Sequence, residues 1–347
     1  MRTCVPVAAI ALAAVACTVN STTNNNGSPV TGDDGGITAT PDSGTPDGAL
    51  AAADADDGAA PQAFVRLAHW SPDAPAVDVC FNPAGGTWSA QSPALGQVAV
   101  APDGGAAADA GDAGDDGGAS ATGVTFPSVT SYLIIAPGTY GVRLVAAGGD
   151  CSTGLVDLPS VVLRENTYTT VAALGEVTPV GTDQALKLGS LTDEVTAPAA
   201  QIALRFVNAS PNASLAQADL GTGSLVVGNG GSPSLALPFS ALFTGVAFGA
   251  AGAPAGTDAG AVDANGYLAE AALAGSTLSV HATNGAQDTT IALNDVTING
   301  GSAATIALIN GVSNGSAASA AKLLLCADAD DSSSTSLFAQ CSIVSTD

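Results

Sequence analysis

The sequence predicts an all-β fold made of two tandem β-sandwich domains, and three observations carry this prediction. Apolar and polar residues alternate in short runs, such as 140–144 and 278–281, as expected for strands that bury one face. Pro-Gly, Asn-Gly and Gly-Gly pairs separate these runs at intervals of about ten residues, which is typical of sandwiches and barrels. A nine-residue pattern occurs twice, as RLAHWSPDA at 66–74 and as RFVNASPNA at 205–213, so the chain is predicted to be a tandem repeat.

The repeat divides the chain into two predicted domains. Adding 135 to the residue numbers aligns the later part of the first half with the second half without a gap. We expect the first domain at 63–196, with a low-complexity insertion at 101–123, and the second at 200–347, with an insertion at 249–264. Each is long enough to bury its own core, so we expect the two to fold independently. Residues 269–274 are the one segment expected to form a helical turn.

Residues 1–16 predict a targeting segment. Arg2 is followed by a short run of apolar and small residues, which is too short for a membrane span of roughly 20 residues and is typical of a secretory signal. Cys17 directly after this run resembles the lipidation site of a bacterial lipoprotein, so we expect Cys17 to become a lipidated N-terminus that anchors the exported chain. Thr18, in place of aspartate, is compatible with an outer-membrane lipoprotein. A plain secretory signal with another cleavage site is the alternative, because Ala14 stands where leucine is usual.

The segment 17–62 is predicted to be a disordered tether. It consists mainly of Asn, Thr, Ser, Gly, Pro, Ala and Asp, with no basic residue and no hydrophobic periodicity. Such a composition cannot bury enough apolar area to offset the entropy of ordering the chain. Behind a lipid anchor, this tether would hold the folded part away from the membrane surface.

The distribution of charge excludes some classes of partner. The net charge is −24, and 14 of the 31 acidic residues lie in the tether or in the two insertions. Only six basic residues follow the targeting segment, and they are scattered. Nucleic-acid binding requires a basic face that neutralises phosphates, so no nucleic-acid partner is expected. The acidic excess also disfavours binding to anionic membrane surfaces.

The cysteines predict two disulfides in an exported chain. Besides Cys17, the mature chain contains Cys80, Cys151, Cys326 and Cys341. The repeat selects one of the three pairings, because the second half lacks both counterparts of the first pair, with Asp219 and Ala286 in their places. We therefore expect one disulfide between the first two cysteines and another between the last two. The spacing of cysteine and histidine gives no zinc site.

Two segments resemble a known family. Residues 65–79 (VRLAHWSPDAPAVDV) resemble the opening motif of DUF4397, a domain of unknown function, and residues 132–144 (YLIIAPGTYGVRL) resemble its Pro-Gly-Thr-Tyr strand. The resemblance covers 64 to about 190 well and extends more weakly over 201–330. It implies an exported, often repeated, β-sandwich-like module on bacterial or archaeal cell surfaces. We interpret each domain as an immunoglobulin-like sandwich. The resemblance implies no activity and no site residues.

The opening motif contains the best candidate for a binding loop. His69 and Asp78 could form an imidazole–carboxylate pair that binds a metal or moves a proton, and Asp73 lies in the turn between them. The alternative is that these side chains only hold the loop in shape by hydrogen bonds. The second half favours this alternative, because it keeps the turn with Asn208 and Gln217 at the corresponding positions.

Other signals of chemistry are weak. No HExxH or phosphate-binding loop occurs, and the only histidines are His69 and His281. The acidic segments 109–117 and 328–331 have a calcium-like composition without the ligand spacing of a calcium loop. We therefore expect no catalytic residue, no metal and no cofactor.

Two functions remain open from the sequence. The first is a cell-envelope-anchored, non-catalytic surface lipoprotein that binds an envelope protein or glycan, or acts as a structural spacer. The alternative is an extracytoplasmic hydrolase with an unrecognised carboxylate or histidine site.

Overall fold

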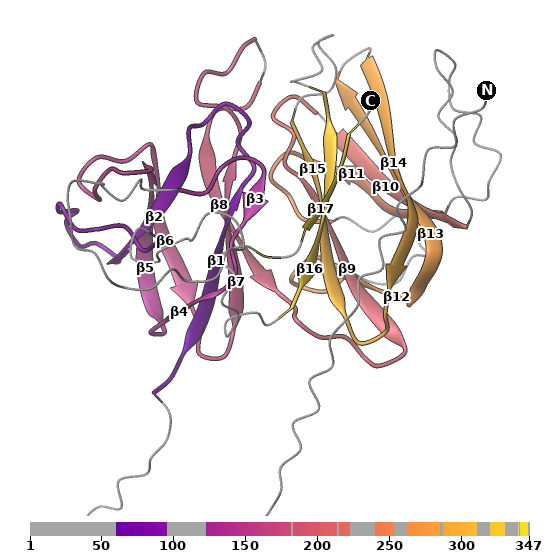
Figure 1. Cartoon of the computed structure of the whole chain (residues 1–347), viewed down its shortest axis with the longest axis horizontal. Coiled ribbons are helices and arrows are strands. Elements are labelled where there is room, and N and C mark those ends of the chain that lie inside the picture. The colour runs from indigo at the N-terminus through magenta and orange to yellow at the C-terminus, as the bar shows by residue number, and fades with distance from the viewer. Residues whose placement is uncertain are drawn as a thin grey trace, which may run out of the picture. The chain divides into compact units, whose positions relative to one another are not determined.

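The computed structural model is all-β (Figure 1). It describes residues 60–95, 123–181, 183–213, 215–222, 240–252, 262–284, 287–310, 320–329, 339 and 341–345. All regular elements within these ranges are strands, and none of the described segments is a helix that could span a bilayer. The targeting segment, Cys17, nearly all of the tether and most of both insertions lie outside the described residues.

The first half contains two sheets with a parallel pair at the centre of the larger one. The strands of the larger sheet are β1 (Ala63–His69), β3 (Ser128–Val129), β4 (Leu133–Ile135), β7 (Tyr168–Leu174) and β8 (Lys187–Asp193). The smaller sheet consists of β2 (Val77–Pro83), β5 (Gly138–Ala146) and β6 (Val156–Leu163). Strand β1 runs parallel to β7, whereas the other pairs are antiparallel.

The second half repeats these pairings and adds strands at the edges. One sheet contains β9 (Gln201–Asn208), β12 (Tyr267–Ala271), β15 (Ala303–Ile309), β16 (Lys322–Asp328) and β17 (Cys341–Ser345). The other contains β10 (Leu215–Thr222), β11 (Ser240–Val246), β13 (Leu273–Asn284) and β14 (Gln287–Ile298). Here β9 runs parallel to β15, as β1 does to β7. Because parallel neighbours need a crossover connection, this shared feature is a specific point of correspondence.

The prediction of a helical turn at 269–274 is wrong. These residues end β12 and begin β13, and Ala269 and Glu270 pair with β9. The alanine-rich composition gave no alternation to mark a strand, and the neighbouring strand provides the pairing that local propensity does not.

Strand alternation places the apolar side chains of each half between its two sheets. In β5, Val142 and Leu144 are fully buried, while Arg143 points to the opposite face. A separate cluster in the second half is built around Leu204, Phe206 and other side chains from both of its sheets. Each half therefore has its own apolar core.

A third apolar cluster joins the two halves. Ala68, Trp70 and Leu174 of the first half pack in one buried cluster with Val207 and Ile309 of the second. The two halves therefore share a buried layer in addition to their own cores. Independent folding of residues 63–196 remains a prediction, and it would require this layer to be exposed.

Both disulfides have the predicted pairing. Cys80 on β2 is bonded to Cys151 in the turn after β5, and Cys326 on β16 is bonded to Cys341 on β17. Cys80 and Cys151 are fully buried, so the first bond lies within the packed structure. The second bond fastens the C-terminal strand to its neighbour in register.

Removing either bond should lower stability without removing the strands. Loop-closure entropy predicts a loss of about 4 kcal/mol for Cys80→Ala with Cys151→Ala and about 3 kcal/mol for Cys326→Ala with Cys341→Ala. Denaturant unfolding of each double variant measures the loss, and far-ultraviolet circular dichroism checks the strand content. Peptide mapping without reduction tests the pairing itself. A peptide joining Cys80 to Cys326 would contradict it.

Candidate functional site

The predicted binding loop follows β1, where His69 is completely buried. The Nε2–H of His69 donates to the carbonyl of Pro75 at 3.0 Å, which leaves Nδ1 as the acceptor nitrogen of a neutral ring. Nδ1 has no hydrogen-bond partner among the described residues. Burial lowers the pKa of His69 below its usual value, despite the hydrogen bond to Pro75. The imidazole is therefore neutral, and in this form it holds the loop through its hydrogen bond to Pro75.

Asp78 and Asp73 bind the backbone around this loop. Asp78 Oδ1 accepts hydrogen bonds from the amides of Val79 at 2.7 Å and Leu95 at 2.9 Å. Asp73 accepts the amides of Val177 at 2.7 Å and Thr178 at 2.8 Å. Burial alone would raise the pKa of Asp73, but these donors lower it. All three predicted residues thus brace the loop, and a ligand-binding role for it remains a prediction.

In the second half, Asn208 occupies the position of His69 and braces the corresponding turn by hydrogen bonds. Its Nδ2 donates to the carbonyls of Val246 at 3.0 Å and Ala213 at 3.3 Å, and its Oδ1 accepts the amide of Ser210 at 3.2 Å. An amide thereby replaces an imidazole as the brace of the turn. The side chain of Asn208 does not titrate, whereas an imidazole such as that of His69 does.

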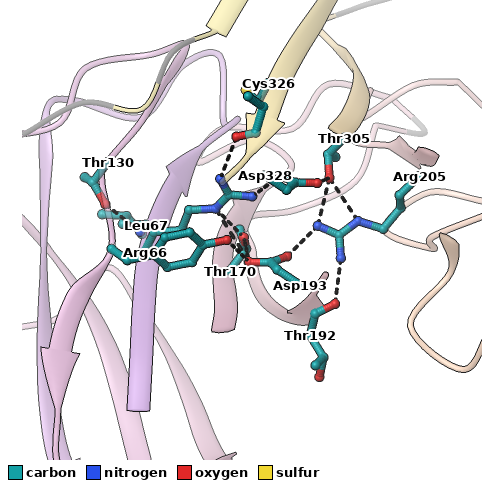
Figure 2. Close-up of polar contacts among 12 residues, drawn as sticks. Arg66, Leu67, Thr130, Thr170, Thr192, Asp193, Arg205, Thr305, Cys326 and Asp328 are labelled. Atoms are coloured by element: carbon teal, nitrogen blue, oxygen red, sulfur yellow. Dashed lines mark hydrogen bonds and ion pairs between the residues drawn. The ribbon is translucent and has the colours of Figure 1, made fainter. Parts of the chain in front are cut away.

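Among the described residues, buried charge is concentrated elsewhere, between the two halves (Figure 2). It consists of Arg66, Asp193, Arg205 and Asp328, which are all at least 94% buried. Arg66 Nη2 donates to Asp328 Oδ1, and Arg205 Nη2 donates to Asp193 Oδ1 at 2.5 Å. Each arginine therefore takes its closest counter-ion from the opposite half.

Neutral donors and acceptors complete each arginine's environment. Arg66 Nε donates to Thr170 Oγ1 at 2.8 Å, and Arg205 Nε donates to Thr305 Oγ1 at 3.1 Å. Arg205 also donates to the carbonyl of Thr192 at 2.9 Å. The strand registers align these groups, because Arg66 lies beside Thr170 and Arg205 beside Thr305 in the two parallel pairs.

A tyrosine from each half packs on its own arginine. The guanidinium of Arg66 lies 4.7 Å from the ring centroid of Tyr132, and that of Arg205 lies 4.5 Å from the centroid of Tyr267. The two phenols donate to Asp193 and to Asp328, each at 2.8 Å. Every carboxylate thus accepts a tyrosine from its own half and an arginine from the other.

The charges in this network stabilise one another. Burial alone would raise the pKa of Asp193, but Arg66 and Arg205 hold it below its usual value. Burial would lower the pKa of Arg66, but Asp193 and Asp328 raise it. Burial and the nearby carboxylates also raise the pKa of Tyr132. Asp193 and both arginines are therefore charged at neutral pH, and the phenols keep their protons.

This arrangement is suited to joining the halves and not to proton transfer or ligand binding. The ionic side chains are directed at one another, and the neighbouring threonine hydroxyls donate to the same carboxylates, as Thr170 does to Asp193 at 2.5 Å and Thr305 to Asp328 at 2.6 Å. A group that transfers a proton or binds a ligand must be able to reach that ligand, whereas these are enclosed. Among the described residues, no group of three His, Cys, Asp or Glu side chains is placed to hold a metal ion.

This network could not be recognised from the sequence, in which Arg66 and Arg205 are distinguished only as the first residues of the repeated pattern. The missed signal is the spacing, since Asp193 and Asp328 are separated by 135 residues, the offset that aligns the later parts of the two halves. Polar residues that recur at the repeat offset on strands expected to be buried are candidates for a shared ionic contact.

A second feature that the sequence missed is a depression on the smaller sheet of the first half. It has a volume of about 180 Å³. Its lining residues are Asn82, Pro83, Gly85, Gly86, Trp88, Gly141, Asp157, Leu158 and Pro159. Arg143 lies beside it, with its guanidinium 4.5 Å from the Trp88 ring centroid. Arg143 also forms two hydrogen bonds to the carboxylate of Asp157, both at 2.7 Å.

Comparison with known proteins gives one family match. The family model of DUF4397, a domain of unknown function, matches residues 97–215. The match supports the family resemblance seen in the sequence, but it begins after the opening motif at 66–74 and extends through its second occurrence at 205–213. It includes Asp193 and Arg205, which form one of the two ion pairs between the halves. None of the curated proteins matches the chain.

Breaking one ion pair should destabilise the chain strongly. Asp328→Asn leaves the buried Arg66 without its closest counter-ion, which should lower the free energy of unfolding by about 3–5 kcal/mol. Replacing both partners, as Arg66→Met with Asp328→Leu, should cost much less, because no unpaired charge remains.

The partly exposed Arg143–Asp157 pair provides the control, since Asp157→Asn should cost less than about 1 kcal/mol. Denaturant unfolding of all three variants measures the differences. Equal effects of Asp328→Asn and Asp157→Asn would show that the buried pair does not hold the structure together.

The neutral His69 should make the first half sensitive to mild acid. Its folded pKa is lowered, so the unfolded chain binds a proton first as the pH falls below the usual histidine value of about 6.5. Stability should therefore fall from that pH until the folded pKa is reached. His69→Asn, which copies Asn208, should remove this loss. Thermal unfolding between about pH 7.5 and 5 compares the two proteins, and parallel pH profiles would refute the assignment.

Proposed function

We propose that the chain is an exported, envelope-anchored and non-catalytic surface lipoprotein with two tandem immunoglobulin-like β-sandwich modules. The modules bind an envelope protein or glycan, or act as a rigid spacer. In this proposal the halves are two copies of one module, related by their shared strand pairings. Cys17 carries the lipid, and the acidic segment 17–62 is the tether to the outer membrane.

The reciprocal ion pairs are the observation that carries this proposal. Arg66 pairs with Asp328 and Arg205 pairs with Asp193, so each half supplies a buried counter-ion to the other. Two modules joined in this way move as one body. A rigid body on a flexible tether is suited to presenting a binding surface or to keeping a fixed distance from a membrane.

The disulfides support the export part of the proposal. Cys80–Cys151 and Cys326–Cys341 require an oxidising compartment, which suggests a location outside the cytoplasm. The acidic net charge of −24 is compatible with a soluble, extended surface protein.

The contacts of the predicted loop support a non-catalytic role. A hydrolase needs a histidine or a carboxylate that can exchange a proton with its substrate. His69 is fully buried, and Asp73 and Asp78 accept backbone amides. These side chains are therefore better suited to holding the loop than to general acid–base catalysis.

Lipid anchoring can be tested on the full-length precursor. The wild type should partition into detergent, and its N-terminal peptide should begin with a lipidated Cys17. The Cys17→Ser variant should remain in the aqueous phase, because it lacks the acceptor thiol. Intact mass and phase partitioning measure both properties. A water-soluble wild type with another N-terminus would refute the anchor.

The binding role needs a separate screen of residues 63–347, the whole predicted folded part. Incubation with envelope glycans and envelope proteins should give saturable binding, whereas ester and glycoside substrates should not be turned over. Turnover that depends on His69 would instead favour the hydrolase.

A further inference from the structure

We propose that the depression beside Trp88 binds one neutral pyranose ring of a glycan chain, an inference that specifies the proposed binding function and rests on it. The site lies in the first half, on the face of the smaller sheet that points away from the core. Its residues come from the end of β2, the turn that follows, and strands β5 and β6.

The indole of Trp88 is held in place before any ligand arrives. The guanidinium of Arg143 packs 4.5 Å from its ring centroid. Behind the ring, a side-chain carbon added at Gly141 would lie 3.5 Å from Trp88 Cζ2, so the indole rests against the backbone of β5. Trp88 also packs on the buried Cys80–Cys151 disulfide. A fixed aromatic surface loses little entropy when a ligand stacks on it.

Arg143 is fixed in turn by four acceptors. It donates to both carboxylate oxygens of Asp157 at 2.7 Å, and its Nη1 donates to the carbonyls of Cys151 and Ser152 at 3.1 Å each. The guanidinium is consequently committed to this position. It orients Trp88 and Asp157 and is not available as an anion site.

Polar groups lie at the rim of the aromatic surface. The amide of Asn82 is oriented by its own hydrogen bond, from Nδ2 to the carbonyl of Thr87 at 3.0 Å. Its Oδ1 has no hydrogen-bond partner among the described residues and can accept a hydroxyl. The side chain of Asp157 remains 40% exposed, so its carboxylate can accept hydroxyls in addition to Arg143.

The combination selects a sugar over other small ligands. A pyranose presents a face of C–H groups that stacks on an aromatic ring, and it carries hydroxyls around its edge. Pro83, Leu158 and Pro159 supply further apolar contacts. The carboxylate of Asp157 and the net charge of −24 disfavour phosphates and acidic sugars. Drug-sized ligands usually occupy pockets of about 300–1,000 Å³, so the volume of about 180 Å³ suits a single ring.

The module does not need these residues in order to fold. Arg143 and Asp157 are paired across β5 and β6, and the corresponding pair across β13 and β14 is Ser279 and Ala292. The second half forms the same strand pairing with this neutral pair. The ion pair that orients the depression is therefore an addition to the first half and not a requirement of the fold.

Ligand-observed saturation-transfer NMR on the full mature chain tests the site. The probes are cellotriose, chitotriose and mannotriose, with a proline-rich decapeptide as the comparison. At least one trisaccharide should give saturable transfer with a Kd in about the millimolar range. Trp88→Ala should weaken binding at least about tenfold, and Trp88→Phe should restore part of it, because a smaller aromatic ring still stacks.

Asn82→Ala provides a second variant, since this half-buried amide is not part of the apolar core. It should weaken the same trisaccharide by about threefold to tenfold. Ser279→Ala, on the corresponding strand of the second half, is the matched control and should leave binding unchanged.

Three results would overturn the proposal. They are no saturable transfer from any trisaccharide up to about 10 mM, binding that Trp88→Ala leaves unchanged, and binding of the decapeptide in preference to the sugars. The last result would identify a site for extended proline-rich segments. The anchor and turnover experiments are independent of this site, so its failure would leave the envelope-anchored, non-catalytic function standing.

Discussion

Two arginines at equivalent positions of the repeat each form their closest ion pair with the opposite half of the chain. Arg66 reaches Asp328, and Arg205 reaches Asp193. Removing a charge from water is costly, and it is repaid only when the partners are close and their remaining hydrogen bonds are satisfied. Here threonine, tyrosine and backbone groups satisfy them. Because the counter-ion belongs to the other half, the desolvation cost is fully offset only when the halves are together.

The symmetry of this contact has consequences for the rest of the interface. In an isologous interface, residue i of one subunit contacts residue j of the other, and the reverse contact also occurs. The arginine–aspartate pairs follow this rule within one chain. The shared apolar layer follows it as well, with Ala68 and Leu174 from one half and Val207 and Ile309 from the other. The C-terminal segment adds a further link, because the amide of Ala339 donates to the carbonyl of Val129 at 2.9 Å.

The sequence was informative where a signal is local or repeated. Alternation placed Arg143 opposite Val142 and Leu144, and the joint absence of two cysteines from the second half selected Cys80–Cys151. Neither signal could reveal the ion pairs, since Arg66 and Asp328 are 262 residues apart and each resembles an exposed polar residue on an alternating strand. Trp88 was missed for a different reason. It lies in an irregular segment without periodicity, and only the sheet behind it shows that the ring is supported.

The two halves thus share an architecture but differ in the side chains at two corresponding places. At the end of the first strand, the second half has the non-titrating Asn208, whereas the first half has His69, which burial keeps neutral. On the smaller sheet, the second half has Ser279 and Ala292, whereas the first half has Arg143 and Asp157. The groups that the common fold needs lie at the interface and occur in both halves. Arg143 and Asp157 lie on the smaller sheet, outside the cluster that joins the halves, so this pair can differ between the halves without weakening that contact.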